Sequence, residues 1–182
     1  MIGPEDAFVP ARPTLLVVGM LAVVAAAVAQ PGASSPGGGS AALPCSDVAQ
    51  RGATEAAYAA RLVELVNAHR RSLGLRRLGI GRALTRSAAW KADHMARHGY
   101  VSHDDLPSRR TLAQRLRSCG FGGRGWGEVL AAGQRWPSAV LRAWLRSGSH
   151  RAVIEAPWWR YAGAGAARSR AGDLYWALDF GA

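Results

Sequence analysis

The sequence predicts an α+β domain in which helices cover a small β-sheet. Three observations lead to this class. Between residues 54 and 145, apolar residues recur at the three- and four-residue spacing of amphipathic helices. After residue 160 the pattern changes to two apolar, strand-like segments separated by a turn. A Gly/Ser/Pro/Ala stretch near the N-terminus separates this domain from what precedes it.

The first two helices are predicted at 54–73 and 82–98, each ending before a glycine, Gly74 and Gly99. The positions at helical spacing are Tyr58, Leu62, Leu65, Val66, His69 and Leu73 in the first, and Leu84, Ala88, Ala92 and Met95 in the second.

Two further helices begin at recognisable start signals. Thr111 and Gln114 have the spacing of a capping box, and Pro137 suits a first helical turn. The expected core faces are Leu112, Leu116 and Cys119 in one helix, and Val140, Leu141, Trp144 and Leu145 in the other.

The strands are expected late in the chain. Residues 161–168 and 174–180 are predicted to pair as a hairpin through a turn at 169–173 that contains Gly172. A further short strand is predicted at 125–131.

The N-terminal region divides into two parts. Residues 1–29 contain an apolar run, Leu15–Ala29, that ends in a small-x-small pattern, and we interpret them as a signal peptide, or as an N-terminal anchor if cleavage does not occur. Residues 30–53, which include Cys45, are expected to form a flexible linker, and 54–182 the domain. The protein is therefore expected to be secreted, or tethered to the membrane by the uncleaved segment.

The chain has two cysteines, Cys45 before the domain and Cys119 inside it. In an exported protein, two cysteines favour one disulfide. Two independent thiols are the alternative.

The formal net charge is +11, and Lys91 is the only lysine among 23 basic residues. A strongly cationic exported protein is expected to associate with anionic envelope polymers or membrane surfaces. No interleaved basic and aromatic motif is present, so no nucleic-acid partner is expected.

His103, Glu128 and His150 are the residues most suited to chemistry. They lie in three short segments far apart in the sequence, so only the tertiary fold could join them. Together they would suit a divalent metal or acid–base chemistry. Taken alone, each histidine is more often a surface or structural residue, and Glu128 could equally pair with an arginine.

Other candidate sites are less well supported. His94 and His98 have a spacing that can chelate a metal, but they lie at the edge of the apolar stripe and are expected to be solvated. No serine lies in a nucleophile elbow, and a disulfide would leave no cysteine nucleophile, so covalent hydrolysis is not supported.

The order of several motifs resembles the CAP (SCP-like) superfamily of cysteine-rich secretory, antigen 5 and pathogenesis-related proteins, in its bacterial secreted form. The similar segments are Leu65–Arg70 with Gly74, Leu75 and Leu78; Ala92–Ala96 and Gly99–His103; Arg110–Thr111, Arg115–Leu116 and Gly120–Phe121; Gly127–Glu128 with Ala131–Gly133; Trp144, Ser147, His150 and Arg151; and Tyr175–Trp176 with Asp179–Gly181.

This resemblance implies a three-layer α-β-α sandwich with a central cavity of two histidines and two acidic residues. His103, Glu128 and His150 match three of these positions, whereas the fourth falls near Ser147, which is not acidic. Three protein ligands would leave a divalent metal such as zinc with an open coordination position. Glu155 is a further carboxylate nearby in the sequence.

The resemblance favours a binding module rather than an enzyme, with the cavity taking a metal, a small ligand or a lipid. One alternative is a metal-dependent hydrolase in which His103 and His150 bind the metal and Glu128 is the general base. In the other, the three residues are purely structural. Fold alone does not decide between them.

Overall fold

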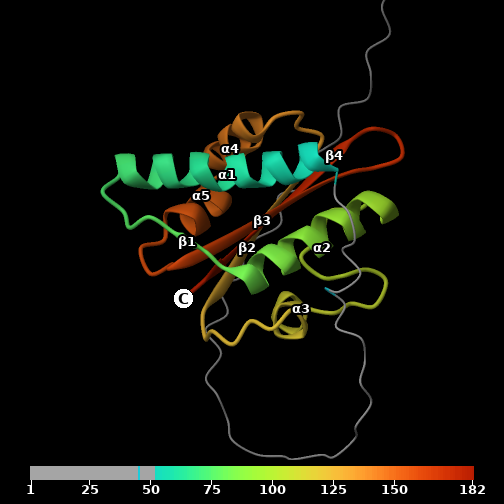
Figure 1. Cartoon of the computed structure of the whole chain (residues 1–182), viewed down its shortest axis with the longest axis horizontal. Coiled ribbons are helices and arrows are strands. Elements are labelled where there is room, and N and C mark those ends of the chain that lie inside the picture. Colours follow the sequence, from blue (N-terminus) through green and yellow to red (C-terminus); the bar gives the residue numbers. More distant parts are fainter. Residues whose placement is uncertain (1–44, 46–51) are drawn as a thin grey trace, which may run out of the picture.

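The computed structural model describes Cys45 and residues 52–182 and contains a four-stranded mixed sheet between helices (Figure 1). The helices are α1 (Ala53–Ser72), α2 (Arg82–His98), α3 (Leu112–Ser118), α4 (Pro137–Arg146) and α5 (Gly148–Glu155). The strands are β1 (Gly79–Ile80), β2 (Trp126–Ala132), β3 (Tyr161–Arg168) and β4 (Leu174–Gly181). They lie in the order β1-β3-β4-β2, with β1 parallel to β3 and the other pairs antiparallel.

The helices form two layers, one on each face of the sheet. Figure 1 shows α1, α4 and α5 on one side and α2 and α3 on the other. The predicted α+β class and three-layer arrangement are therefore confirmed.

Alternation along β4 divides the core between the two faces. Leu174, Trp176, Leu178 and Phe180 are buried in the cluster that includes α1, α4 and α5, whereas Ala177 packs with α2. Because successive strand residues point to opposite faces, Asp179 lies on the α2 side. Glu128 lies on the same side as Asp179. It is two residues before Leu130 of β2, which packs with residues of α2, and alternate strand residues share a face.

Two glycines allow α2 to lie unusually close to β3. A Cβ at Gly163 would stand 2.1 Å from the backbone nitrogen of Thr85, and one at Gly165 would stand 2.3 Å from the carbonyl oxygen of Ala88. Neither position has room for a side chain. The small residues of β3 thus allow α2 to pack closely on the face of the sheet that carries Glu128 and Asp179.

Most predicted elements are confirmed, with boundaries shifted by a residue or two. The capping box at Thr111 and Gln114 is formed, and Pro137 occupies the first turn of α4. Two elements were not predicted. One is α5, whose first residues are Gly148, Ser149 and His150, none a strong helix former. The other is β1, which at two residues is too short to show a period.

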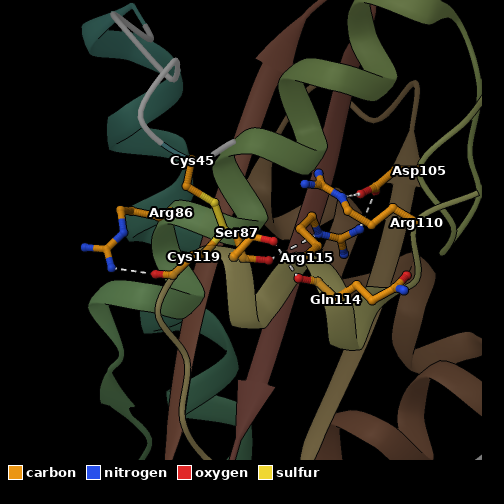
Figure 2. The surroundings of a disulfide bond; sticks show 9 residues. Cys45, Arg86, Ser87, Asp105, Arg110, Gln114, Arg115 and Cys119 are labelled. Atoms are coloured by element: carbon orange, nitrogen blue, oxygen red, sulfur yellow. Dashed lines mark hydrogen bonds and ion pairs between the residues drawn. A yellow bond between two sulfur atoms is a disulfide. The ribbon is translucent and has the colours of Figure 1, made fainter. Parts of the chain in front are cut away.

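The predicted disulfide is formed between Cys45 and Cys119, with their Cα atoms 5.4 Å apart. Both cysteines are buried, and Cys119 caps the C-terminus of α3. Figure 2 shows the bridge beside the buried residues of α2 and α3.

The predicted signal peptide or anchor, and all of the predicted linker except Cys45 and the two residues next to the domain, lie outside the described residues. Within Cys45 and 52–182, no helix is long and apolar enough to cross a bilayer.

Candidate functional site

Glu128 is a buried carboxylate whose two oxygens are both engaged. Its Oε2 lies 2.8 Å from His103 Nδ1, and its Oε1 forms an ion pair with the guanidinium of Arg115. Both the predicted contact with a histidine and the alternative, an arginine partner, are therefore present. Glu128 lies on β2, and its partners come from α3 and from the loop after α2.

Arg115, fully buried in α3, joins Glu128 to a second carboxylate. It pairs with Asp105, and its Nε donates to Ser87 Oγ at 3.2 Å. Asp105 also accepts from Lys91 Nζ at 2.9 Å and from Arg110 Nε at 2.7 Å. Figure 2 shows Asp105, Arg110, Arg115 and Ser87 gathered to one side of the disulfide. Buried charges require such pairing, because an unpaired ion in the interior costs several kcal/mol.

The same cations hold the loop that carries His103. Lys91 Nζ lies 2.9 Å from the carbonyl oxygen of Asp104 and 3.4 Å from that of His103, and Arg115 also donates to the latter at 3.4 Å. The backbone at His103 is therefore fixed from the buried side, while the His103 side chain is 36% exposed.

The electrostatics define the tautomer of His103. Burial opposes ionisation of Glu128, but the charges of Arg115 and His103 outweigh it and lower the pKa of Glu128. An ionised carboxylate only accepts hydrogen bonds, so His103 Nδ1 must donate to it. In neutral His103 the lone pair then lies on Nε2. No hydrogen bond to Nε2 is formed by any residue that the structure describes.

Asp179 is a second buried carboxylate beside Glu128, and it was not among the predicted site residues. The two occupy paired positions of β4 and β2. Neither carboxylate oxygen of Asp179 has a hydrogen-bond partner within the described residues. Burial and the charge of Glu128 raise the pKa of Asp179 well above its ordinary value, which favours the protonated form of this carboxyl group. Only the strand register, which the sequence does not give, identifies this neighbour.

His150, on α5, does not contact Glu128 or His103 through a hydrogen bond. Its Nδ1 lies 2.9 Å from Ser147 Oγ. Burial, and then the charge of His103, lower the pKa of His150, so the two imidazoles are near enough to interact electrostatically. Glu155 pairs with His69 of α1 at 2.9 Å and does not join this site.

The residues fit a weak two-imidazole metal site and not a closed structural one. In the part of the chain that is described, no group of three or more His, Cys, Asp or Glu side chains is arranged to hold a metal ion. Glu128 is engaged by Arg115, so it fits the role of a carboxylate that orients a ligating histidine. The Nε2 atoms of His103 and His150 remain as donors.

His94 and His98 were both expected to be solvated, and only one of them is. His98 is exposed as predicted, but His94 is half-buried, stacks on Trp90 with ring centroids 4.4 Å apart, and lies 2.7 Å from Tyr100 Oη through its Nδ1. Burial lowers the pKa of His94 to about 4. This histidine is part of the packing between α2 and the following loop.

Comparisons with known proteins agree with the fold. Residues 63–180 match the family described as the cysteine-rich secretory protein family, CAP. YkwD of Bacillus subtilis, described as uncharacterized, is 35% identical over 109 residues, which are 60% of this chain and 42% of that relative. The chain therefore spans less than half of the relative's length.

Two solved structures are similar over most of the domain. An extracellular protein containing a SCP domain from Bacillus anthracis matches with a TM-score of 0.63 and 25% identity, over 70% of this chain and 41% of that one. An outer surface protein of Borrelia burgdorferi matches with a TM-score of 0.62 and 22% identity, over 67% of this chain and 90% of that one. The second likeness concerns the fold alone.

Proposed function

Because this chain belongs to the cysteine-rich secretory protein (CAP) family, we propose that it is an extracellular binding domain whose His103 and His150 hold a divalent cation, such as zinc, or a small ligand. The observation that carries this proposal is the arrangement of Glu128, which holds His103 by its Nδ1 and leaves Nε2 free to bind. A bound cation would supply a positive centre with positions open to an oxygen-bearing or anionic ligand.

The same arrangement disfavours a hydrolase with Glu128 as general base. A general base needs a free lone pair within reach of the proton it takes and a pKa near the working pH. Both oxygens of Glu128 are engaged, and its pKa is lowered. Asp179 is a poor replacement, because its side chain is fully buried beneath α2.

A purely structural role is the second candidate. In its favour, Arg115, Glu128, Asp105 and Lys91 form a network of ion pairs that is complete without a ligand. In this case His103 serves only to close the outer side of the network, and His150 only contacts Ser147.

An extracellular location is supported by several observations. The similar structures from Bacillus anthracis and Borrelia burgdorferi are described as an extracellular protein and an outer surface protein. A disulfide such as Cys45–Cys119 persists in an oxidising compartment. With a net charge of +11, the chain would associate with anionic polymers of the cell envelope.

The test is a zinc titration at neutral pH, followed by calorimetry, on the wild type and on His103→Ala, His150→Ala and His98→Ala. We expect saturable one-to-one binding that the first two variants lose and the third keeps, because His98 is an exposed histidine away from Glu128. If the wild type does not bind, the structural candidate replaces this proposal. If only His98→Ala loses binding, the metal site is on α2 and the proposal is wrong.

A further inference from the structure

Three exposed apolar side chains lie on two neighbouring segments of the fold. Six large apolar side chains among the described residues are about half exposed or more, and the three on segments 73–80 and 156–160 are Leu73 at 50%, Ile80 at 60% and Trp158 at 58% exposure. Tyr161 is not included, because Tyr161 pairs with Gly79 and Ile80 with Ala162, so the side chains of Tyr161 and Ile80 point to opposite faces of the sheet. We call these two segments together the Trp158 surface.

Buried hydrogen bonds hold the two segments against each other. Arg70 of α1 donates to the carbonyl oxygen of Arg76 at 3.1 Å and to that of Ala156 at 2.9 Å. The backbone nitrogen of Gly79 donates to the carbonyl oxygen of Arg160 at 2.9 Å, where β1 pairs with β3. Figure 1 shows β1 after the loop that follows α1, and β1 is the edge strand of the sheet next to β3. The exposed side chains therefore project from a fixed framework.

A second pair of hydrogen bonds fixes the segment 73–80. The side chain of Asn67 both donates to the carbonyl oxygen of Leu78, at 3.0 Å, and accepts from its backbone nitrogen, at 2.7 Å. Both interactions are buried. The backbone on either side of Leu78 is thus held in place, although the side chains of Arg77 and Ile80 are exposed.

Arginines surround the exposed apolar side chains. Arg76, Arg77 and Arg160 are exposed within the two segments, and Arg71 is exposed in the last turn of α1. Neither segment contains an acidic residue. The adjacent Glu155 is paired with His69. The surface is therefore both apolar and cationic.

From this combination we infer that the Trp158 surface binds the face of a bilayer that contains anionic phospholipid. Tryptophan favours the boundary between lipid headgroups and acyl chains, because it has an apolar ring and a polar group. Arginine binds phosphate oxygens with two parallel hydrogen bonds. The inference specifies the envelope partner of the proposed function and rests on it.

Other occupants fit less well. Two copies of the chain meeting through this surface would bring their arginines together without acids to neutralise them. A soluble anionic polymer would use the arginines but would leave Trp158 and Ile80 in water. A lipid surface with anionic headgroups uses both kinds of side chain.

The test measures sedimentation of the exported protein with vesicles of one part phosphatidylglycerol to three parts phosphatidylcholine, and with pure phosphatidylcholine. The two surface variants are Ile80→Ser with Trp158→Ser, and Arg76→Gln with Arg77→Gln. The matched controls are Trp136→Ser, which alters an equally exposed tryptophan elsewhere, and Arg142→Gln with Arg146→Gln, which removes the same charge from α4.

We expect the wild type to bind the anionic vesicles at least about tenfold more tightly than the neutral ones, and each surface variant to lose roughly tenfold. The controls should change by less than about twofold. Equal loss in the controls would show that binding depends on overall charge and would overturn the inference. A loss of binding confined to the arginine variant would indicate a polymeric anion and would also overturn the inference. The inference is likewise overturned if the wild type forms a dimer that the Ile80→Ser/Trp158→Ser variant dissociates.

A parallel measurement with isolated cell-wall polymer separates this inference from the proposed function. Binding to the polymer without binding to vesicles contradicts only the bilayer partner. Binding to neither contradicts the envelope association itself. The zinc titration is independent of both, because none of the substituted residues contacts His103 or His150.

Discussion

Glu128 and Asp179 occupy paired positions on β2 and β4, both buried under α2, yet only Glu128 has charged partners. Two neighbouring carboxylates cannot both ionise in such a place without further cations. Arg115 and His103 stabilise the charge on Glu128, whereas burial and the nearby charge of Glu128 raise the pKa of Asp179. Because the ionised form is stabilised at Glu128, this carboxylate accepts a hydrogen bond from His103 Nδ1 and so fixes the tautomer of His103.

Asp179→Asn should change the pH dependence of stability. In the unfolded chain Asp179 loses its proton near its ordinary pKa of 3.8, whereas the folded protein keeps it. The wild type therefore loses stability as the pH rises above about 4, until the raised folded pKa is reached. The neutral amide lacks this loss. The stability of the variant relative to the wild type should increase by more than about 1 kcal/mol between pH 4 and pH 7.

Urea unfolding at several pH values measures this difference. Asp173→Asn removes an exposed carboxylate from the turn between β3 and β4 and controls for the change in net charge. A difference between Asp179→Asn and the wild type that stays constant with pH would show that Asp179 ionises normally in the folded protein.

Arg115→Met should destabilise the domain by about 3–5 kcal/mol, because it leaves Glu128 and Asp105 buried without a shared cation. Arg117→Met, two residues further along α3 and exposed, should change stability by less than about 0.5 kcal/mol. Urea unfolding at pH 7 compares the two. Similar effects of the two substitutions would mean that the buried ion pairs do not stabilise the fold.

The sequence predicted the elements whose signals are local. Helical periodicity, the capping box at Thr111 and the hairpin before β4 each depend on a few neighbouring residues. The contact between His103 and Glu128 was also anticipated, as was an arginine partner for Glu128. Which arginine it is could not be predicted, because Arg115 is selected by the packing of α3 on β2.

The rest of the site depends on tertiary contacts with no local pattern. Lys91 lies on α2 and Asp105 in the loop after it, and neither belongs to a motif that indicates a buried ion pair. Asp179 is recognised as the partner of Glu128 only once the register of β2 and β4 is known. The separation of His150 from Glu128 likewise depends on where α5 lies.

Gly165→Ala should lower the free energy of unfolding by at least about 1–3 kcal/mol, because the added methyl group would collide with the carbonyl of Ala88 and push α2 away from β3. Gly148→Ala is the matched control, since its Cβ would meet nothing within 4 Å. That variant should be as stable as the wild type or slightly more so. Chemical unfolding distinguishes them. Equal stability of both variants would show that α2 can shift freely.

Replacing both Cys45 and Cys119 by serine should cost about 4 kcal/mol, because the bridge closes a loop across 74 positions of the sequence. Reduction of the wild type should lower the melting temperature to that of the variant. Calorimetry with and without reductant measures this. If reduction has no effect on the wild type, the disulfide does not stabilise the domain.

Lys91 should be unreactive in the native protein although it is the only lysine of the chain. Its side chain is fully buried, and its ammonium group lies within hydrogen-bonding distance of four oxygen atoms: Tyr100 Oη, Asp105 Oδ1 and the carbonyls of His103 and Asp104. A compact ammonium directs three N–H donors out of a common plane toward such a cluster, whereas the donors of a guanidinium all lie in its plane. An amine-reactive ester should therefore modify only the terminal amine until the protein unfolds.

Mass spectrometry of the labelled protein measures the modification, and Arg71→Lys, which introduces an exposed amine on α1, is the positive control. Labelling of Lys91 should appear at the urea concentration at which the domain unfolds. Labelling at lower concentrations, before global unfolding, would mean that the loop carrying His103 opens independently. The network of Lys91, Asp105 and Arg115 would then not be what fixes His103 beside Glu128.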